Sequence, residues 1–171
     1  MEENWKVTKY KDGTAIPTGH SNSDWSNLTT GAYAVYDNDT SNVDIYGNLY
    51  NWYAVDDSRG VCPTNYHVPS DDDFQQLEIY LGMSSQDADS WGLRGSNEGS
   101  KLAGDSYLWD DDILINNSEF GTSSFDGRPS GYILNNNGNF YKMGEYGAFW
   151  SSFSLPNSND ACSRDLNYNH T

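Results

Sequence analysis

The sequence predicts an α+β fold with one main helix at about residues 70–81, a short second helix, small antiparallel sheets and long loops. Three observations support this prediction. Only one segment combines a strong capping signal with apolar residues at helical spacing, the other apolar stretches have the length of short strands, and Gly, Asn, Ser and Asp separate them. A chain of 171 residues is long enough for one hydrophobic core, so we expect a single domain over residues 1–171.

The main helix has clear start and stop signals. Ser70 is expected to cap its N-terminus, and Asp71–Asp73 follow in the first turn, where the helix dipole favours negative charge. Gly82 is expected to end the helix. The apolar face is predicted to consist of Phe74, Leu77 and Leu81.

The segments after this helix are predicted to be less regular. A short second helix is expected to begin at Ser84, with Ala88 and Trp91 on its inner side. Residues 95–104 contain three glycines and are expected to form a loop. Tyr107 and the residues next to it are expected to enter the core.

Short apolar segments predict the strands. We expect strands at residues 5–10, 32–36, 49–55, 131–134, 140–141 and 148–150. The turn at residues 135–138, Asn-Asn-Asn-Gly, favours a hairpin because Asn and Gly tolerate positive φ angles. Short connections predict antiparallel pairing for the last three strands. Trp150 is expected to be mainly a core residue.

The composition limits the classes of partner. Nine basic and twenty-five acidic residues give a net charge of −16, which repels phosphate backbones and anionic lipids. Because of this charge we expect no nucleic-acid binding. The sequence also lacks an apolar run of about 20 residues, so we expect no membrane insertion. Abundant Asn, Ser, Thr, Gly and Tyr with few Lys favour an extracellular or cell-surface location, with the leader absent from this chain; a cytosolic protein is the alternative.

One loop offers oxygen ligands of the kind that calcium prefers. Asp37, Asp39, Ser41 and Asp44 stand at near-alternating spacing, as at the start of a calcium loop. However, Asn42 occupies the position of the required Gly, and Asn48 that of the Glu. A solvated turn is therefore favoured, and we expect no cofactor, with Ca²⁺ at this loop as the alternative.

The other residue types that carry chemistry do not form a pattern. The three histidines, His20, His67 and His170, lack metal-ligand spacing. Cys62 and Cys162 fit either one disulfide or two buried thiols. Chance pairs of carboxylates are common in so acidic a chain. We therefore expect no enzymatic activity.

Several motifs resemble a known family. In order they are VTKYKDGTAIP, YGNLYNWYAV, CPTNYHVPSDDDFQQLEIYLG, RGSNEGSKLAG, FGTSSFDGRPSGY and GAFWSS. This series resembles the Fibrobacter succinogenes major paralogous domain, a family of secreted bacterial modules. That family is similar in turn to the formylglycine-generating-enzyme branch of the C-type-lectin-like fold. The resemblance implies a C-type-lectin-like domain over nearly the whole chain.

The resemblance also bears on the cysteines. The family usually has a terminal strand carrying a cysteine after the region that here ends at Thr171, which implies a truncated or divergent end. Cys162 is then left as the only intrachain partner for Cys62. The related oxidases use a copper-binding cysteine pair, and only Cys162 lies in a comparable region, so oxidase activity is not implied.

We expect a binding module that recognises a glycan or protein ligand through its C-terminal loops. Loops 135–145 and 154–171 are rich in Tyr, Asn, Ser and Asp, which is typical of recognition loops. The candidate ligand-binding residues are Asn137, Tyr141, Asn157, Asn159, Asp160, Arg164, Asn167 and Tyr168. The alternatives are a structural, self-associating extracellular subunit and a ligand-binding protein diversified by a retroelement, since the tail holds residue types expected from altered asparagine codons.

Overall fold

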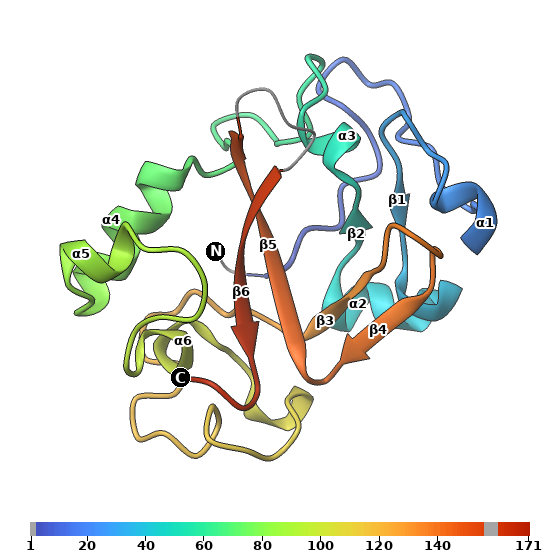
Figure 1. The fold of residues 1–171 in the computed structure, drawn as a ribbon. Helices are drawn as coiled ribbons and strands as arrows, with labels where there is room; N and C mark the ends of the chain where they lie inside the picture. The colour runs from blue at the N-terminus through green and yellow to red at the C-terminus, as the bar shows by residue number, and fades with distance from the viewer. Residues whose placement is uncertain (1–2, 156–160) are drawn as a thin grey trace.

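The computed structural model describes residues 3–155 and 161–171, and it has the predicted α+β architecture with small sheets and long loops (Figure 1). The α-helices are α1 (Asn22–Trp25), α2 (Val43–Tyr46), α3 (Trp52–Val55), α4 (Asp71–Leu81), α5 (Ser85–Ala88) and α6 (Glu98–Leu102). The 3-10 helices are η1 (Tyr36–Asn38), η2 (Thr40–Asn42) and η3 (Ser106–Leu108). The strands are β1 (Tyr33–Ala34), β2 (Leu49–Tyr50), β3 (Ser130–Ile133), β4 (Phe140–Met143), β5 (Tyr146–Ser154) and β6 (Ala161–Asn167).

The main helix, α4, is confirmed. The Ser70 hydroxyl accepts the Asp73 N–H, and the Asp73 carboxylate accepts the Ser70 N–H, which together form a capping box. Gly82 ends the helix with φ 121°, a conformation that favours glycine. Phe74 is buried as predicted, while Glu78 is also buried, which the apolar pattern did not predict.

The larger sheet has the strand order β4-β3-β5-β6. The predicted hairpin is confirmed, since β3 and β4 pair antiparallel around the turn at residues 135–138. The prediction that all these strands are antiparallel is wrong, because β3 and β5 are parallel where Gly131 faces Gly147. The turn between β3 and β4 and the turn between β4 and β5 each reverse the direction of the chain. Because β5 lies beside β3 and not on the outer side of β4, two reversals separate these neighbours, and they run parallel.

The predicted strand at residues 49–55 is wrong beyond its first two residues. β2 ends at Tyr50, and α3 begins at Trp52. The Asn51 side chain causes the change, because its Oδ1 accepts the N–H of Ala54, 3.0 Å away, and so caps α3. The same oxygen accepts the N–H of Ala32 at 2.9 Å, which ties α3 to the segment before β1.

Other boundaries also differ from the predictions. The segment 5–10 forms no strand beyond a single bridge between Lys9 and Ala15, and the strand expected at 32–36 shortens to β1. The segment 95–104, predicted as a loop, contains α6 because Ser100 becomes fully buried and donates to the Leu114 carbonyl at 2.9 Å. Trp91 and Tyr107 are predicted to face the core, and both predictions are wrong. Trp91 is 73% exposed because the second helix ends before it, and Tyr107 is 97% exposed on η3.

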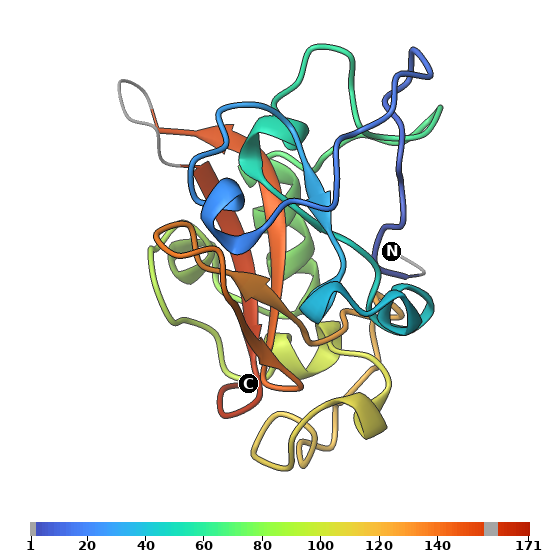
Figure 2. The same cartoon turned by 90° about the vertical axis from the view of Figure 1, so that its right-hand side faces the viewer.

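The described residues contain three hydrophobic clusters. The first contains Tyr10, Ile16, Ala54, Val61 and Cys62, the second Ala103, Trp109, Leu114 and Leu166, and the third Trp25, Ala32 and Ala34. Trp150 links the sheet to the N-terminal half, because its indole nitrogen donates to the Tyr50 carbonyl at 2.8 Å and its ring packs on Trp52. The helix α4 and the segments around β1 and α3 lie on opposite sides of the β5–β6 pair (Figures 1 and 2).

Within residues 3–155 and 161–171, none of the helices combines the length and the apolar character that crossing a membrane requires.

Candidate functional site

A pocket of about 390 Å³ beside α3 is the candidate site, and we call it the Tyr53 pocket. Its polar lining consists of Thr14, Thr29, Thr30, Tyr53, Asp57 and Arg59. Ala15, Pro17 and Gly31 complete it. The volume falls within the range of about 300–1,000 Å³ that is usual for small-molecule sites.

Three separate segments of the chain build this pocket. Thr14 follows the Asp12–Gly13 turn, in which the Asp12 carboxylate accepts the Thr14 N–H at 2.8 Å. Thr30 follows α1, and its carbonyl accepts from the side-chain amide of Asn51 at 2.9 Å. Tyr53 lies on α3, where it is 45% exposed. The Asn51 side chain therefore fixes both the Thr30 wall and the helix that carries Tyr53.

Gly31 allows the segments to pack closely below the pocket. A Cβ atom at this position would overlap the Tyr10 hydroxyl and lie 2.9 Å from Cα of Ala54. Only glycine therefore fits between the first hydrophobic cluster and the pocket wall.

Asp57 and Arg59 form a rigid ion pair at the edge of the pocket. The Arg59 side chain donates from Nε to Asp57 Oδ1 at 2.8 Å and from Nη2 to Oδ2 at 2.7 Å, and the Arg59 backbone N–H donates to Oδ1 at 2.9 Å. The guanidinium also lies 3.9 Å from the centre of the Tyr10 ring, so it stacks on the core. A bidentate, stacked arginine has little freedom to move, although 38% of its side chain is exposed.

The electrostatics of this pair follow from the hydrogen bonds. The bonds from Arg59 lower the pKa of Asp57 to about 2, and those to Asp57 raise the pKa of Arg59. Both groups therefore stay charged at neutral pH. Because their charges cancel, the pair adds polarity to the pocket without adding net charge.

Sequence reasoning missed this pocket. It placed Tyr53 in a buried strand, and it could not bring together three segments that are distant in the chain. One local signal was available: Asp57 and Arg59 stand two residues apart in a turn that ends at Gly60, a spacing that permits a bidentate ion pair.

The structure brings together two of the predicted ligand-binding residues. The Asn137 amide, in the β3–β4 turn, donates to the Tyr141 hydroxyl at 3.1 Å. The Tyr141 ring stacks on Tyr132, with 5.9 Å between the ring centres. Gly138 packs directly on the backbone of Asn22, so the turn leans on α1. Asn157, Asn159 and Asp160 lie outside the described residues.

Arg164 has a different environment from that of an exposed loop residue. On β6, it donates from Nε to Glu78 at 2.9 Å and contacts Asp71 at 2.6 Å, both on α4. Arg94 donates to the same Glu78 carboxylate at 2.9 and 3.1 Å. These side chains are mostly buried and form a network that holds α4 to β6.

The last two predicted ligand residues lie where β6 ends. Asn167 faces Tyr146 in the sheet, and the Tyr168 carbonyl accepts the Leu114 N–H at 3.0 Å. Tyr168 also packs against the second hydrophobic cluster. Asn167 and Tyr168 therefore lie at the end of β6 that pairs with the beginning of β5.

The loop considered for calcium forms η1, η2 and α2. Asp39 caps η2 by accepting the Ser41 N–H at 3.0 Å, and this bond lowers the pKa of Asp39. Asp37 and Asp44 are exposed. In the part of the chain that the structure describes, His, Cys, Asp and Glu form no group of three or more that could hold a metal ion. Calcium at this loop remains a prediction.

Both cysteines are buried, but the structure does not join them by the predicted disulfide. Cys62 belongs to the first hydrophobic cluster, where burial raises the pKa of its thiol. Cys162 lies on β6, at the irregular end of its pairing with β5.

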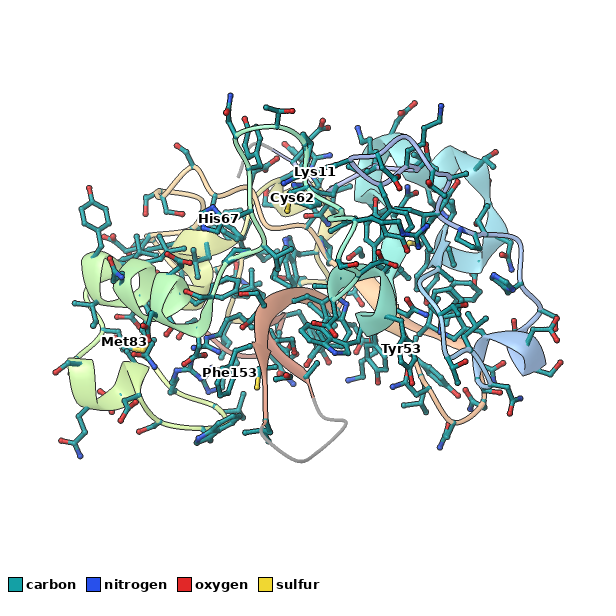
Figure 3. All side chains as sticks on the ribbon, turned by 90° about the horizontal axis from the view of Figure 1, so that it is seen from above. Lys11, Tyr53, Cys62, His67, Met83 and Phe153 are labelled. Carbon is teal, nitrogen blue, oxygen red and sulfur yellow. The ribbon has the colours of Figure 1, made fainter. Side chains whose placement is uncertain are left out.

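A second pocket, of about 340 Å³, lies between residues 65–69 and α4. Its apolar lining includes Phe74, Leu77 and Phe125. At its edge, His67 lies 3.4 Å from the Asp73 carboxylate, although both side chains are well exposed. Figure 3 places His67 on a different side of the molecule from Tyr53.

Comparison with known proteins identified one family. The family model described as the Fibrobacter succinogenes major domain matches residues 1–168. We found no match to the chain among curated proteins and none among solved structures. The resemblance to the family is thereby confirmed, while the C-type-lectin-like fold remains a prediction.

Proposed function

We propose that this chain, which belongs to the Fibrobacter succinogenes major domain family, is a secreted or cell-surface binding module without catalytic activity that recognises a glycan or protein ligand. One observation carries the proposal. The Tyr53 pocket combines an exposed aromatic ring, three threonines and an immobilised ion pair in a concave surface. Concave sites with apolar walls and a few fixed polar groups are typical of ligand binding.

The surroundings of the pocket support the same proposal. Tyr53 of α3 and Phe153 near the end of β5 lie on the same side of the molecule (Figure 3), and both are exposed. Exposed aromatic rings provide contact area with few rotatable bonds, so ordering them costs little entropy.

A screen with two arms tests the proposal. The purified chain is applied to an array of plant, bacterial and animal glycans and, separately, to a panel of purified extracellular proteins. We expect saturable binding in at least one arm. Chromatography of the recovered ligand should show it unchanged after prolonged incubation, whereas cleaved or modified ligand would contradict a binding module. Absence of saturable binding in both arms would contradict the proposal altogether.

Self-association is the second candidate, and exposed apolar side chains favour it. Near the C-terminal end of α4 and beyond α5, Tyr80, Trp91 and Leu93 are 86%, 73% and 77% exposed. Large exposed apolar side chains often mark protein–protein contacts. Sedimentation at several protein concentrations tests this candidate.

A further inference from the structure

We infer that the Tyr53 pocket binds a neutral sugar residue, with one face of the sugar ring on Tyr53 and its hydroxyl groups on the Asp57–Arg59 pair. This inference rests on the proposed function and specifies the class of ligand. Three independent properties of the pocket lead to it: its charge, its unused hydrogen-bonding groups and its mixture of apolar and polar surface.

The charge of the pocket selects an uncharged ligand. Arg59 and Asp57 neutralise each other through two side-chain hydrogen bonds, so neither a cation nor an anion finds an unpaired opposite charge there. The whole chain carries a net charge of −16, which further disfavours anions. A cation would have to compete with Arg59 for the Asp57 carboxylate, whose bonds are short and charge-assisted.

The ion pair leaves hydrogen-bonding capacity that fits hydroxyl groups. An arginine side chain has five N–H donors, and Asp57 uses one on Nε and one on Nη2. The two bonds to Asp57 come from Nε and Nη2, so the Nη1 donors of Arg59 lie outside this pairing. Because the guanidinium is stacked on Tyr10, these donors are held in place before a ligand arrives.

The remaining lining fits the two kinds of surface that a sugar ring presents. A pyranose has a face of C–H groups, which packs on an aromatic ring, and an edge of hydroxyl groups, which both donate and accept hydrogen bonds. Tyr53 offers an exposed ring for the first, and the hydroxyls of Thr14, Thr29 and Thr30 extend the polar surface for the second. A volume of about 390 Å³ accommodates a sugar residue or two rather than a long segment of polymer.

Titration calorimetry with defined oligosaccharides tests the inference. The probes are the neutral tetramers of cellulose, xylan, mannan and starch, the anionic tetramer of polygalacturonate and the cationic tetramer of chitosan. We expect at least one neutral tetramer to bind, and the two charged tetramers to bind at least about tenfold more weakly, a difference of roughly 1.4 kcal/mol.

Variants assign the binding to the pocket. Tyr53→Ala should weaken binding about tenfold or more because it removes the stacking surface, whereas Tyr53→Phe keeps the ring and should bind nearly as well as the wild type. Arg59→Lys should weaken binding to a similar extent because lysine lacks the planar, bidentate donor set. Tyr107→Ala is the matched control, since Tyr107 is 97% exposed and does not line the pocket. Thermal melts establish that each variant is folded.

The outcomes separate the inference from the proposed function. Preferential binding of a charged tetramer would overturn the inference, as would equal losses from Tyr53→Ala and Tyr107→Ala. If a purified protein binds and none of the neutral tetramers does, the inference fails while the proposed function stands. If neither the tetramers nor the glycan and protein screens give binding, both fail.

Discussion

The Arg164 guanidinium lies between two carboxylates of α4, and Glu78 also accepts hydrogen bonds from Arg94. The Glu78 and Arg164 side chains are only 8% and 16% exposed, so the charges are largely removed from water. Such charges are tolerated only when they are paired, because an unpaired buried charge keeps its full desolvation cost. A polar network of this kind explains why a carboxylate occupies the inner face of a helix.

Glu78→Ala is therefore expected to lower the free energy of unfolding by about 3–5 kcal/mol, since it leaves two arginines without their shared acceptor. Urea denaturation measures the change. Glu119→Ala serves as the control, because Glu119 is exposed and its carboxylate makes no hydrogen bond or ion pair within the described residues. If both variants lose the same small amount, the network does not hold α4 to β6.

The Asp57 carboxylate gives a pH-dependent test of the pocket. Hydrogen bonds from Arg59 lower its pKa from the ordinary 3.8 to about 2. A lowered pKa contributes stability above the unfolded value, and this contribution is lost as the pH falls through the folded value. The stability difference between the wild type and Asp57→Asn should therefore be constant near neutral pH. It should shrink between pH 3.8 and about 2.

Urea denaturation of both proteins at a series of pH values measures this difference, and subtracting the two curves cancels most other titrating groups. Oligosaccharide binding to the pocket, where present, should weaken over the same interval. A difference that stays constant down to pH 2 would show that Arg59 and Asp57 are not paired in solution.

At the scale of elements, the cap of α4 explains why this helix could be predicted. Ser70 and Asp73 satisfy each other's backbone N–H groups, and the Asp73 carboxylate also accepts the Ser70 hydroxyl at 2.7 Å. The bond from that hydroxyl is the main reason that the pKa of Asp73 is lowered. All of these contacts join residues three positions apart, so the sequence alone contains them.

Ser70→Ala is expected to reduce the free energy of unfolding by about 1 kcal/mol, because the Asp73 N–H loses the hydroxyl that accepts its hydrogen bond and the Asp73 carboxylate loses the bond from that hydroxyl. Chemical denaturation provides the measurement, and Ser118→Ala, at an exposed position outside the helices and strands, is the matched control. Equal stability of the two variants would show that the capping box does not stabilise α4.

The elements that could not be predicted depend on distant contacts. Asn51 ends β2 and begins α3 by bonding to Ala54 nearby and to Ala32 nineteen residues away, and periodicity does not reveal the second bond. The apolar run around it therefore resembled one strand. The same limit applies to the Tyr53 pocket, whose ion pair is local but whose threonines come from two other segments.

At the scale of the whole molecule, charge and exposed apolar surface act in opposite directions. A net charge of −16 repels a second copy, while Trp91 and Leu93 offer apolar surface that water disfavours. Salt weakens the first effect without weakening the second, since the Debye length falls to about 10 Å at 0.1 M ionic strength and to about 3 Å at 1 M. Any association through this surface should therefore strengthen as salt is added.

Sedimentation velocity over a range of protein and sodium chloride concentrations measures this balance. We expect the average sedimentation coefficient to rise with both concentrations, and a double variant, Trp91→Ser with Leu93→Ser, to remove most of the rise. Tyr107→Ser is the control, because it removes an even more exposed aromatic ring from η3 and leaves the surface beyond α5 intact. Association that weakens with salt would indicate contacts between opposite charges, and a double variant that behaves as the wild type would exclude the Trp91–Leu93 surface as the contact.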